Sequence, residues 1–307
     1  MKSIFSRAAK SGGQTGIHRT ELGVATAQVV DTPAGRKPVL AHCRFEPATD
    51  QDAAIRAARR IPNRKLPAVS VLPSERYSML LVEAPDVPSD ELRAAVRWRI
   101  KDLIDFHIDD AVLDVFQMPR RGSSGPNQMM YAIAARADGV QSEVRIAEEA
   151  GIKLKAIDIL ELSLRNLALL LDRDDRGIAL LYLAETSGVL LIVRQRTLYL
   201  ARRLETGVRT LRDSIGIRTE LVAGLALEAR RSLDYFESHY EQSALSVLYA
   251  AGLQPADLDQ MSGELGVSVR NIELGSLFET GIALDDEQSR RCMPAIGAAL
   301  RHDGVAL

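Results

Sequence analysis

A strand–turn–strand stretch near the middle of the chain is the first candidate for chemistry. Three short apolar runs, at residues 178–183, 189–193 and 198–201, are separated by two polar segments, of which the first reads Glu185-Thr186-Ser187-Gly188. Short apolar runs between tight turns predict a three-stranded meander. Because backbone N–H groups in a tight turn can surround an anion, residues 185–188 are either a phosphate cradle or only a turn.

Motifs that bind nucleotides or perform catalysis in other folds are missing from this sequence. The segments "SGGQTG" (11–16) and "GSSGPN" (122–127) lack the Lys-Ser/Thr pair of a P-loop, and no G-x-G-x-x-G follows a strand. There is no G-x-S-x-G elbow. The five histidines do not have the spacing of metal ligands; they are His18, His42, His107, His239 and His302. The residues alone therefore predict no catalytic residues and no metal site.

Composition bounds the class of protein. The 307 residues are 46% hydrophobic and 26% charged, which predicts a globular chain of two domains or two lobes. A net charge of −2 gives no reason to expect nucleic acid or an anionic membrane surface as a partner. No window holds the ~18 apolar residues of a spanning helix, and the N-terminus lacks a signal-peptide core. We expect a soluble cytoplasmic protein in which Cys43 and Cys292 are buried free thiols.

The first half of the chain predicts seven strands and three helices, with a compact α/β unit among them. A helix capped by Thr49 runs to Arg60, and a second helix over 87–104 has Ser89 as its N-cap. A third helix over 140–150 ends at Gly151. The predicted strands are 16–18, 23–30, 37–46, 68–73, 77–85, 111–119 and 129–136, the last two joined by the loop "RRGSSGPN". The order β-α-β-β-α-β over 67–158 predicts one compact unit.

The second half repeats this pattern of elements. A helix over 161–171 precedes the meander, and a longer one over 219–240 follows it. The apolar stripe of the longer helix is Val222, Leu225, Ala229, Leu233, Phe236 and Tyr240. Strands at 244–252 and 267–274 flank a helix at 254–266, and a last helix over 286–301 contains Pro294. We interpret Arg202-Arg203 as a solvated pair and expect Arg231 to be buried against Glu228.

Three segments in this order resemble an actin-like pilus-assembly family that includes PilM and the mannose-sensitive haemagglutinin (MSHA) pilus protein MshI. They are "VPSDELRAAVRWRIKDLIDFHIDDAVLDV" (87–115), "EARRSLDYFES" (228–238) and "PAIGAALR" (294–301). Their order and spacing extend the resemblance over nearly the whole chain, and the MshI branch is the more similar. The resemblance implies an α/β, actin-like ATPase fold: two ribonuclease-H-like lobes with an inserted β-α-β-β subdomain. The implied parts are 1–66 and 158–286 for the lobes, 67–157 for the insert with its return to the first lobe, and 287–307 for a C-terminal helix on the first lobe.

The resemblance also locates the nucleotide site, and this sequence departs from it. In the first phosphate hairpin, His18 and Thr20 replace the family's Asp and Gly, and Glu21 follows. In the second hairpin, Tyr182 and Ala184 replace an acid and a glycine, and Glu185 adds negative charge; on the adenosine side Gly252 is retained. Mg²⁺ prefers oxygen ligands, and a carboxylate beside a triphosphate is repulsive. We therefore expect no cofactor and no catalysis, although weak ATP binding stays open.

The function that the resemblance implies is a non-catalytic scaffold of a type IV (MSHA-like) pilus or a type II secretion-like assembly platform. Its expected partner is a bitopic, PilN-like inner-membrane protein, captured through its cytoplasmic N-terminal segment, so that the scaffold is peripheral to the inner membrane. A secretion ATPase is a further candidate partner. We expect the partner groove near Trp98, Phe106 and His107 and strands 23–45; the alternative for Trp98 and Phe106 is core packing. The competing functions are an ATPase that gates pilus assembly and a sugar kinase.

Overall fold

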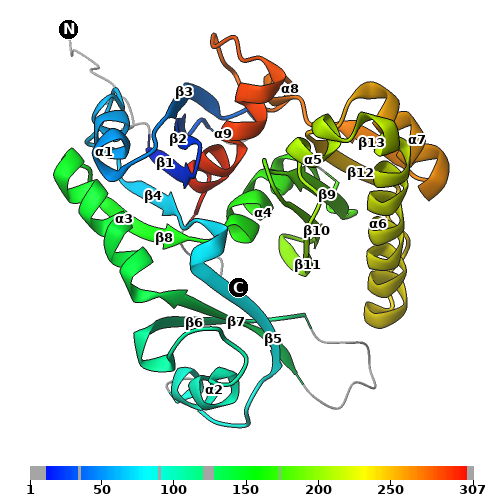
Figure 1. Ribbon diagram of the computed structural model, residues 1–307, viewed down its shortest axis with the longest axis horizontal. Helices are drawn as coiled ribbons and strands as arrows, with labels where there is room; N and C mark the ends of the chain where they lie inside the picture. Colours follow the sequence, from blue (N-terminus) through cyan, green and yellow to red (C-terminus); the bar gives the residue numbers. More distant parts are fainter. Residues whose placement is uncertain (1–11, 34–35, 89–90, 120–127, 173, 303–307) are drawn as a thin grey trace, which may run out of the picture.

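The computed structural model describes residues 12–33, 36–88, 91–119, 128–172 and 174–302, and these form two five-stranded sheets and a three-stranded one (Figure 1). The predicted N-cap Ser89, the whole loop "RRGSSGPN" (120–127) and residues 1–11 lie outside the described residues. No helix in the described ranges is both long enough and apolar enough to cross a membrane.

The two large sheets have the same topology, which confirms the repeated pattern of elements. The first has the order β3-β2-β1-β4-β8 and the second the order β11-β10-β9-β12-β13. In each, an antiparallel meander is extended by two parallel strands. The strands are β1 (Gly13–Thr20), β2 (Gly23–Val30), β3 (Val39–Pro47), β4 (Ala68–Val71), β8 (Leu154–Asp158), β9 (Ile178–Leu183), β10 (Gly188–Arg194), β11 (Thr197–Leu204), β12 (Val247–Ala251) and β13 (Ser268–Asn271).

The third sheet belongs to a β-α-β-β insert in the first lobe. It consists of β5 (Tyr77–Glu83), β6 (Ala111–Gln117) and β7 (Met129–Arg136) in the order β5-β7-β6, with α2 (Leu92–Ile100) on one face. The prediction of a single compact unit over 67–158 is wrong, because its first and last strands, β4 and β8, pair with each other in the first sheet. Parallel strands need a long crossover connection, and this crossover holds the insert and α3 (Ala137–Ala150).

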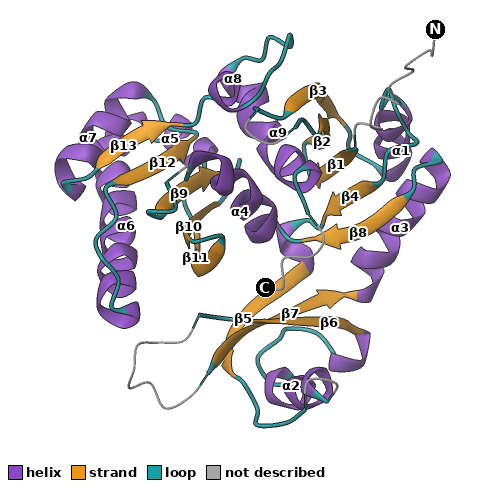
Figure 2. Ribbon diagram, turned by 180° about the vertical axis from the view of Figure 1, so that it is seen from behind, coloured by secondary structure: helices purple, strands orange, loops and turns teal. Residues whose placement is uncertain are grey.

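Helices separate the two large sheets and cover their outer faces (Figures 1 and 2). Helices α1 (Gln51–Arg59) and α3 cover the first sheet, and α6 (Arg218–Tyr240) and α7 (Pro255–Leu265) cover the second. Helices α4 (Leu160–Leu171) and α9 (Asp286–Ala299) lie between the sheets, with α9 against β1, β2 and β4. The remaining short helices are α5 (Val208–Asp213), α8 (Leu274–Leu277), and the 3₁₀ turns η1 (Ser74–Arg76), η2 (Ile108–Asp110) and η3 (Ile215–Ile217).

The sequence pattern predicted the positions and buried faces of the helices better than the residues at which they begin and end. The stripe on α6 is buried as expected, and Gly151 ends α3 in the left-handed region with φ 69°. The cap of α1 is Asp50, which accepts from the Ala53 N–H at 2.7 Å, rather than Thr49. Helix α2 ends at Ile100, four residues earlier than predicted, in a turn closed by the Leu103 N–H and the Ile100 carbonyl (2.9 Å).

The two thiols are neighbours across the first lobe. Cys43 on β3 and Cys292 on α9 are buried and free, as predicted. A hydrogen bond between them, together with burial, raises the pKa of the Cys43 thiol. Their contact was not foreseen, since 249 residues separate them (292 − 43).

Two glycines let α9 approach its neighbours closely. A Cβ on Gly16 of β1 would lie 1.7 Å from the Ala295 carbonyl oxygen of α9. A Cβ on Gly297 of α9 would lie 2.1 Å from the Ser163 carbonyl oxygen of α4. A backbone atom cannot move aside for an added methyl group as a flexible side chain can. The stacking of β1, α9 and α4 therefore requires glycine at both positions.

We predict that Gly16→Ala destabilises the protein by about 3 kcal/mol or more, since the added methyl group must displace α9. Urea unfolding followed by circular dichroism measures this. Gly224→Ala on α6 is the matched control, because no atom lies within 4 Å of its added Cβ. It should be neutral or slightly stabilising. Equal stability of the two variants would contradict the prediction.

Candidate functional site

The turns of the two meanders face each other across one cleft of about 400 Å³. The β1–β2 turn (19–22) lines one wall, and the β9–β10 turn (184–188) lines the other, next to Arg290 and Arg291 of α9. Of the seven positions that the sequence analysis selected, six line this cleft: His18, Thr20, Glu21, Tyr182, Ala184 and Glu185. The duplicated topology brings them together, because each turn occupies the same place in its own sheet.

His18 is a buried, neutral imidazole at the end of β1. Its side chain is 6% exposed, and burial lowers its pKa to about 4. The Nδ1 atom has no hydrogen-bond partner among the residues that the structure describes. Since Mg²⁺ favours carboxylate, carbonyl and water oxygens, this ring is a poor substitute for a metal-binding acid.

Tyr182 occupies the matching position at the end of β9. It is buried, and burial raises its pKa to about 12, so its hydroxyl stays protonated at neutral pH. Neither position of the pair therefore carries a negative charge that could hold a cation.

Glu185 is surrounded by arginines. Its carboxylate accepts from Arg212 Nη2 at 3.3 Å and from Arg290 Nη2 at 3.5 Å, and Arg291 Nη2 lies 3.9 Å away. Arg290 also donates to the Leu183 carbonyl at 3.1 Å, and Arg291 stacks on the Phe45 ring at 4.6 Å. The second turn thus contains an anion of its own, neutralised from α5 and α9.

Gly252 does not line this cleft but lines a neighbouring cavity of about 920 Å³, which shares Arg290 with it. Its φ of +97° is in the region that favours glycine. A Cβ there would lie 2.8 Å from Val208 Cγ1 and 3.1 Å from Arg290 Cδ. The backbone conformation and the passage of Arg290 therefore account for this glycine without a nucleotide.

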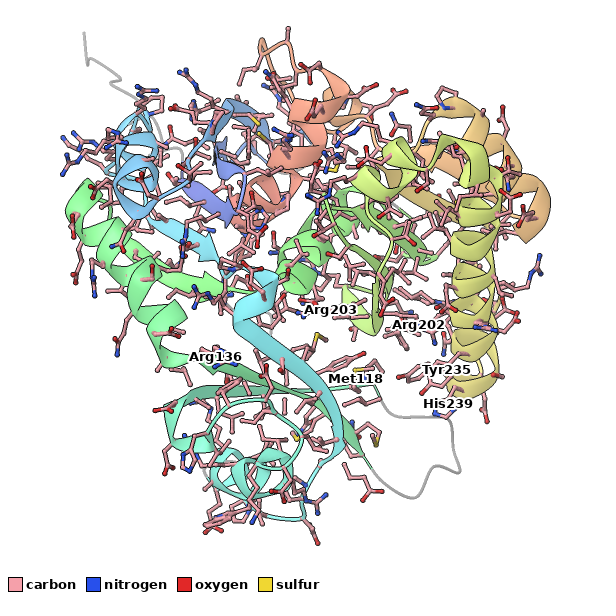
Figure 3. The ribbon with its side chains drawn as sticks, in the orientation of Figure 1. Met118, Arg136, Arg202, Arg203, Tyr235 and His239 are labelled. Atoms are coloured by element: carbon pink, nitrogen blue, oxygen red, sulfur yellow. The ribbon has the colours of Figure 1, made fainter. Side chains whose placement is uncertain are left out.

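An ion pair between a buried acid and a partly exposed arginine, at the edge of the cleft, joins the insert to the second lobe. Glu161 of α4, 1% exposed, accepts from Tyr77 Oη at 2.5 Å and from Arg203 Nε at 3.1 Å. Arg203 stacks on the Tyr77 ring at 4.5 Å, and Figure 3 shows it between β11 and the insert. The pKa of Tyr77 is raised by burial and by the Glu161 charge. In addition, the Ala201 N–H donates to Tyr131 Oη at 3.2 Å.

The structure refines the expectations for Arg202-Arg203 and for Arg231. Arg202 and Arg203 are both partly exposed, as expected, but each is paired: Arg203 binds the buried Glu161, and Arg202 binds Glu228 at 3.0 Å. Arg231 does pair with Glu228, at 2.7 Å, but it is exposed rather than buried. Alternation with apolar residues could not reveal that Arg203 binds a buried acid, because its partner Glu161 is 42 residues away.

A second groove, of about 510 Å³, lies where the first lobe meets the insert. Its lining consists of Arg19, Thr20, Glu21, residues 48–51, Pro73, Glu75, Arg76 and Arg136. The β1–β2 turn and η1 contribute to both the groove and the cleft, so one wall separates them.

The arginines of this groove are engaged, whereas its acids are exposed. Arg19 binds the buried Glu143 through two bonds of 2.8 and 3.0 Å. Arg76 pairs with Asp138 at 3.3 Å, and Arg136 with Asp105 at 3.2 Å. The exposed carboxylates that line the groove are Glu21, Asp50 and Glu75.

The three residues expected in the partner groove are not brought together with strands 23–45. Helix α2 lies on the far side of the insert, at the opposite end of the molecule from β3 (Figures 1 and 2). Trp98 is 72% exposed, so core packing does not explain it, and His107 is exposed as well. Phe106 is half-buried beneath Arg136 (4.4 Å), a residue that lines the second groove.

We predict that stability falls more steeply below pH 6.5 in the natural protein than in His18→Phe. The pKa of His18 is about 4 in the folded protein and 6.5 in the unfolded chain, so the unfolded chain takes up the proton first as the pH falls. Through this group the free energy of unfolding decreases by roughly 2 kcal/mol by pH 5. Urea midpoints from pH 7 to 5 measure the slope. His302→Phe, at an exposed position, should keep the natural slope. An unchanged slope in His18→Phe would refute the assignment.

Comparisons with known structures agree on the fold. The PilM–PilN type IV pilus biogenesis complex matches with a TM-score of 0.71 and 20% identity, covering 94% of this chain and 97% of the other. The cytoplasmic domain of EpsL, an inner-membrane component of the Vibrio cholerae type II secretion system, matches with a TM-score of 0.51 and 10% identity (93% and 95% covered). The ethanolamine utilization protein EutJ of Carboxydothermus hydrogenoformans matches with a TM-score of 0.51 and 11% identity, covering 95% of this chain and 90% of the other. The chain therefore has the actin-like ATPase fold.

Sequence comparison identifies the family. Among curated proteins no sequence matches the chain significantly. Residues 44–256, about two thirds of the chain, match the family described as type IV pilus assembly protein PilM. The match includes the insert, the β9–β10 turn and α6. The chain therefore belongs to the PilM family of type IV pilus assembly proteins.

Proposed function

We propose that this protein is a non-catalytic scaffold of a type IV, MSHA-like pilus or of a related secretion platform, bound to the cytoplasmic face of the inner membrane through a partner. The observation that carries the proposal is the Glu185 carboxylate, which occupies the second turn with Arg212, Arg290 and Arg291 around it. Phosphates placed there would meet a fixed negative charge, and the pair His18 and Tyr182 offers no acid for a metal ion.

The proposed partner is a PilN-like bitopic membrane protein, held by its cytoplasmic N-terminal segment in the groove between the first lobe and the insert. The similar structure of a PilM–PilN complex supports this kind of partner. Charge supports the groove: Glu21, Asp50 and Glu75 are exposed, whereas Arg19, Arg76 and Arg136 are each paired within the protein. Segments on the cytoplasmic flank of a membrane helix are rich in Lys and Arg, which would complement these acids.

The insert supplies a second surface for the same assembly. Trp98 and His107 are exposed on or after α2, and Leu103 beside them is exposed too. We keep Trp98, Phe106 and His107 as candidate contacts, with Phe106 acting through Arg136 at the groove and Trp98 at a separate surface for a further platform component such as a secretion ATPase.

An ATP-binding switch is the competing function, and one observation favours it. The cleft and the 920 Å³ cavity meet at Arg290, so the space for a larger ligand persists. The scaffold is the better-supported function, because Glu161 and Glu185, two of the acids that line the cleft, are both paired with arginines, and Glu21 and Glu75 add further negative charge to the lining.

We predict no saturable binding of Mg-ATP to the natural protein by isothermal titration at concentrations up to about 1 mM, which corresponds to about 4 kcal/mol of binding free energy. The reason is the fixed charge of Glu185 and the absence of an acid at His18 and Tyr182. A dissociation constant in the low micromolar range would overturn the proposed loss of nucleotide binding and favour the switch.

We predict that Glu21→Lys combined with Glu75→Lys weakens binding of a synthetic PilN-like N-terminal peptide at least tenfold, about 1.4 kcal/mol, because the exposed acids of the groove become basic. Fluorescence anisotropy of labelled peptide measures this. Glu220→Lys combined with Asp234→Lys, both at exposed positions on α6, is the charge-matched control and should bind normally. If only Trp98→Ala weakened binding, the partner site would be on α2 and the groove assignment would be wrong.

A further inference from the structure

The arginines around Glu185 differ in how far other groups neutralise them. Arg212 also donates to Asp213 at 3.3 Å, and Arg291 pairs with Glu287 one turn earlier on α9. Arg290 has no second acid within ion-pair distance in the described structure; its other partner is the Leu183 carbonyl. Its side chain is only 8% exposed. Glu185 is therefore the counter-ion of a buried guanidinium, and a buried charge without a counter-ion is costly.

Two residues that line the cleft carry a buried nitrogen with no hydrogen-bond partner among the described residues. One is the Nε atom of Arg291, which is a donor. The other is the Nδ1 atom of His18, whose side chain is more than nine-tenths buried. Arg209 adds a further cation to the lining. The wall made by α5 and α9 thus has more donor capacity than one carboxylate uses.

We propose that Arg212, Arg290 and Arg291 form a binding site for phosphate-type oxyanions and that Glu185 is the built-in anion that occupies and blocks it. This rests on the proposed loss of nucleotide binding in the cleft and goes beyond it, because it assigns the loss to one replaceable side chain. Planar guanidinium groups donate paired hydrogen bonds to carboxylate and to phosphate oxygens alike, so either anion can satisfy the same arginines.

The bond also has a mechanical role. Glu185 belongs to a turn of the second sheet, whereas Arg290 and Arg291 belong to α9, which packs on β1 and β2 of the first sheet. The carboxylate therefore ties the second lobe to the helix seated on the first lobe, without a diffusible ligand. Removing it should loosen the first turns of α9, and an oxyanion that refills the site should tighten them again.

The test uses inorganic pyrophosphate as the probe, at constant ionic strength, with the full chain. Glu185→Ala should bind pyrophosphate at least tenfold more tightly than the natural protein in isothermal titration. Hydrogen exchange over residues 286–293 should be about tenfold faster in Glu185→Ala than in the natural protein and should slow again with pyrophosphate. Adding Arg290→Met to Glu185→Ala should abolish binding, whereas Glu21→Ala, on the opposite wall, should not create it.

Three results would overturn the proposal: a folded Glu185→Ala protein that does not bind pyrophosphate, binding that survives Arg290→Met, or equal binding by the natural protein. If Glu185→Ala does not fold, Glu185→Gln keeps the shape and removes the charge, and pyrophosphate must then raise its melting temperature more than that of the natural protein. Titration of the natural protein with Mg-ATP tests the proposed function separately. Tight ATP binding with Glu185 in place refutes that function, whereas a silent Glu185→Ala variant refutes only the present inference.

Discussion

The close stacking of β1, α9 and α4 is the constraint on which the rest of this structure depends. The last helix of the chain lies between the two sheets, and backbone meets backbone at Gly16 and at Gly297. Because α9 is fixed there, Arg290 and Arg291 reach the turn of the second sheet and Cys292 reaches Cys43. The two lobes, the cleft between them and the ion pairs inside it therefore follow from one tightly packed helix.

Within that frame the cleft is stabilised by side chains of the protein itself. Glu185 neutralises arginines from α5 and α9, and Glu161 binds Tyr77 and Arg203 at the edge of the insert. These are partly or fully buried charge-assisted bonds, whose loss is far more costly than the loss of surface ion pairs. These internally paired charges in the lining of the cleft are the basis on which we propose a scaffold rather than an enzyme.

Much of the fold could be predicted from the sequence, because its signals are local. The stripe on α6 and the runs that form β9, β10 and β11 have the periods of their elements, and the duplicated pattern showed that two turns are equivalent. The boundaries of the insert were less predictable. Strands β4 and β8 pair with each other across 82 intervening residues (154 − 71 − 1), and no local pattern reports such pairing.

In the candidate site, too, local features could be predicted from the sequence, whereas contacts between distant residues could not. His18 and Glu185 could be selected from their place in the turns, but the partners of Glu185 are 27 and 105 residues away. Trp98 was placed near strands 23–45 although α2 lies on the far side of the insert, since an apolar stripe does not reveal which sheet it covers. Gly252 was selected as a retained glycine of the nucleotide site, but its positive φ and its close contacts with Val208 and Arg290 explain it without a ligand.

The wall shared by the cleft and the groove has a consequence for how an assembly with this scaffold would be controlled. The β1–β2 turn borders both the cleft and the groove. In a protein that exchanges a ligand in the cleft, the position of this turn would depend on whether the ligand is bound. Under the proposed loss of nucleotide binding, the opposite turn is held by the permanent ion pairs of Glu185, and the shared wall would have no exchangeable ligand to follow. Occupancy of the groove would then obey simple mass action. Supply of the membrane partner, rather than the energy charge of the cell, would set how many platforms form.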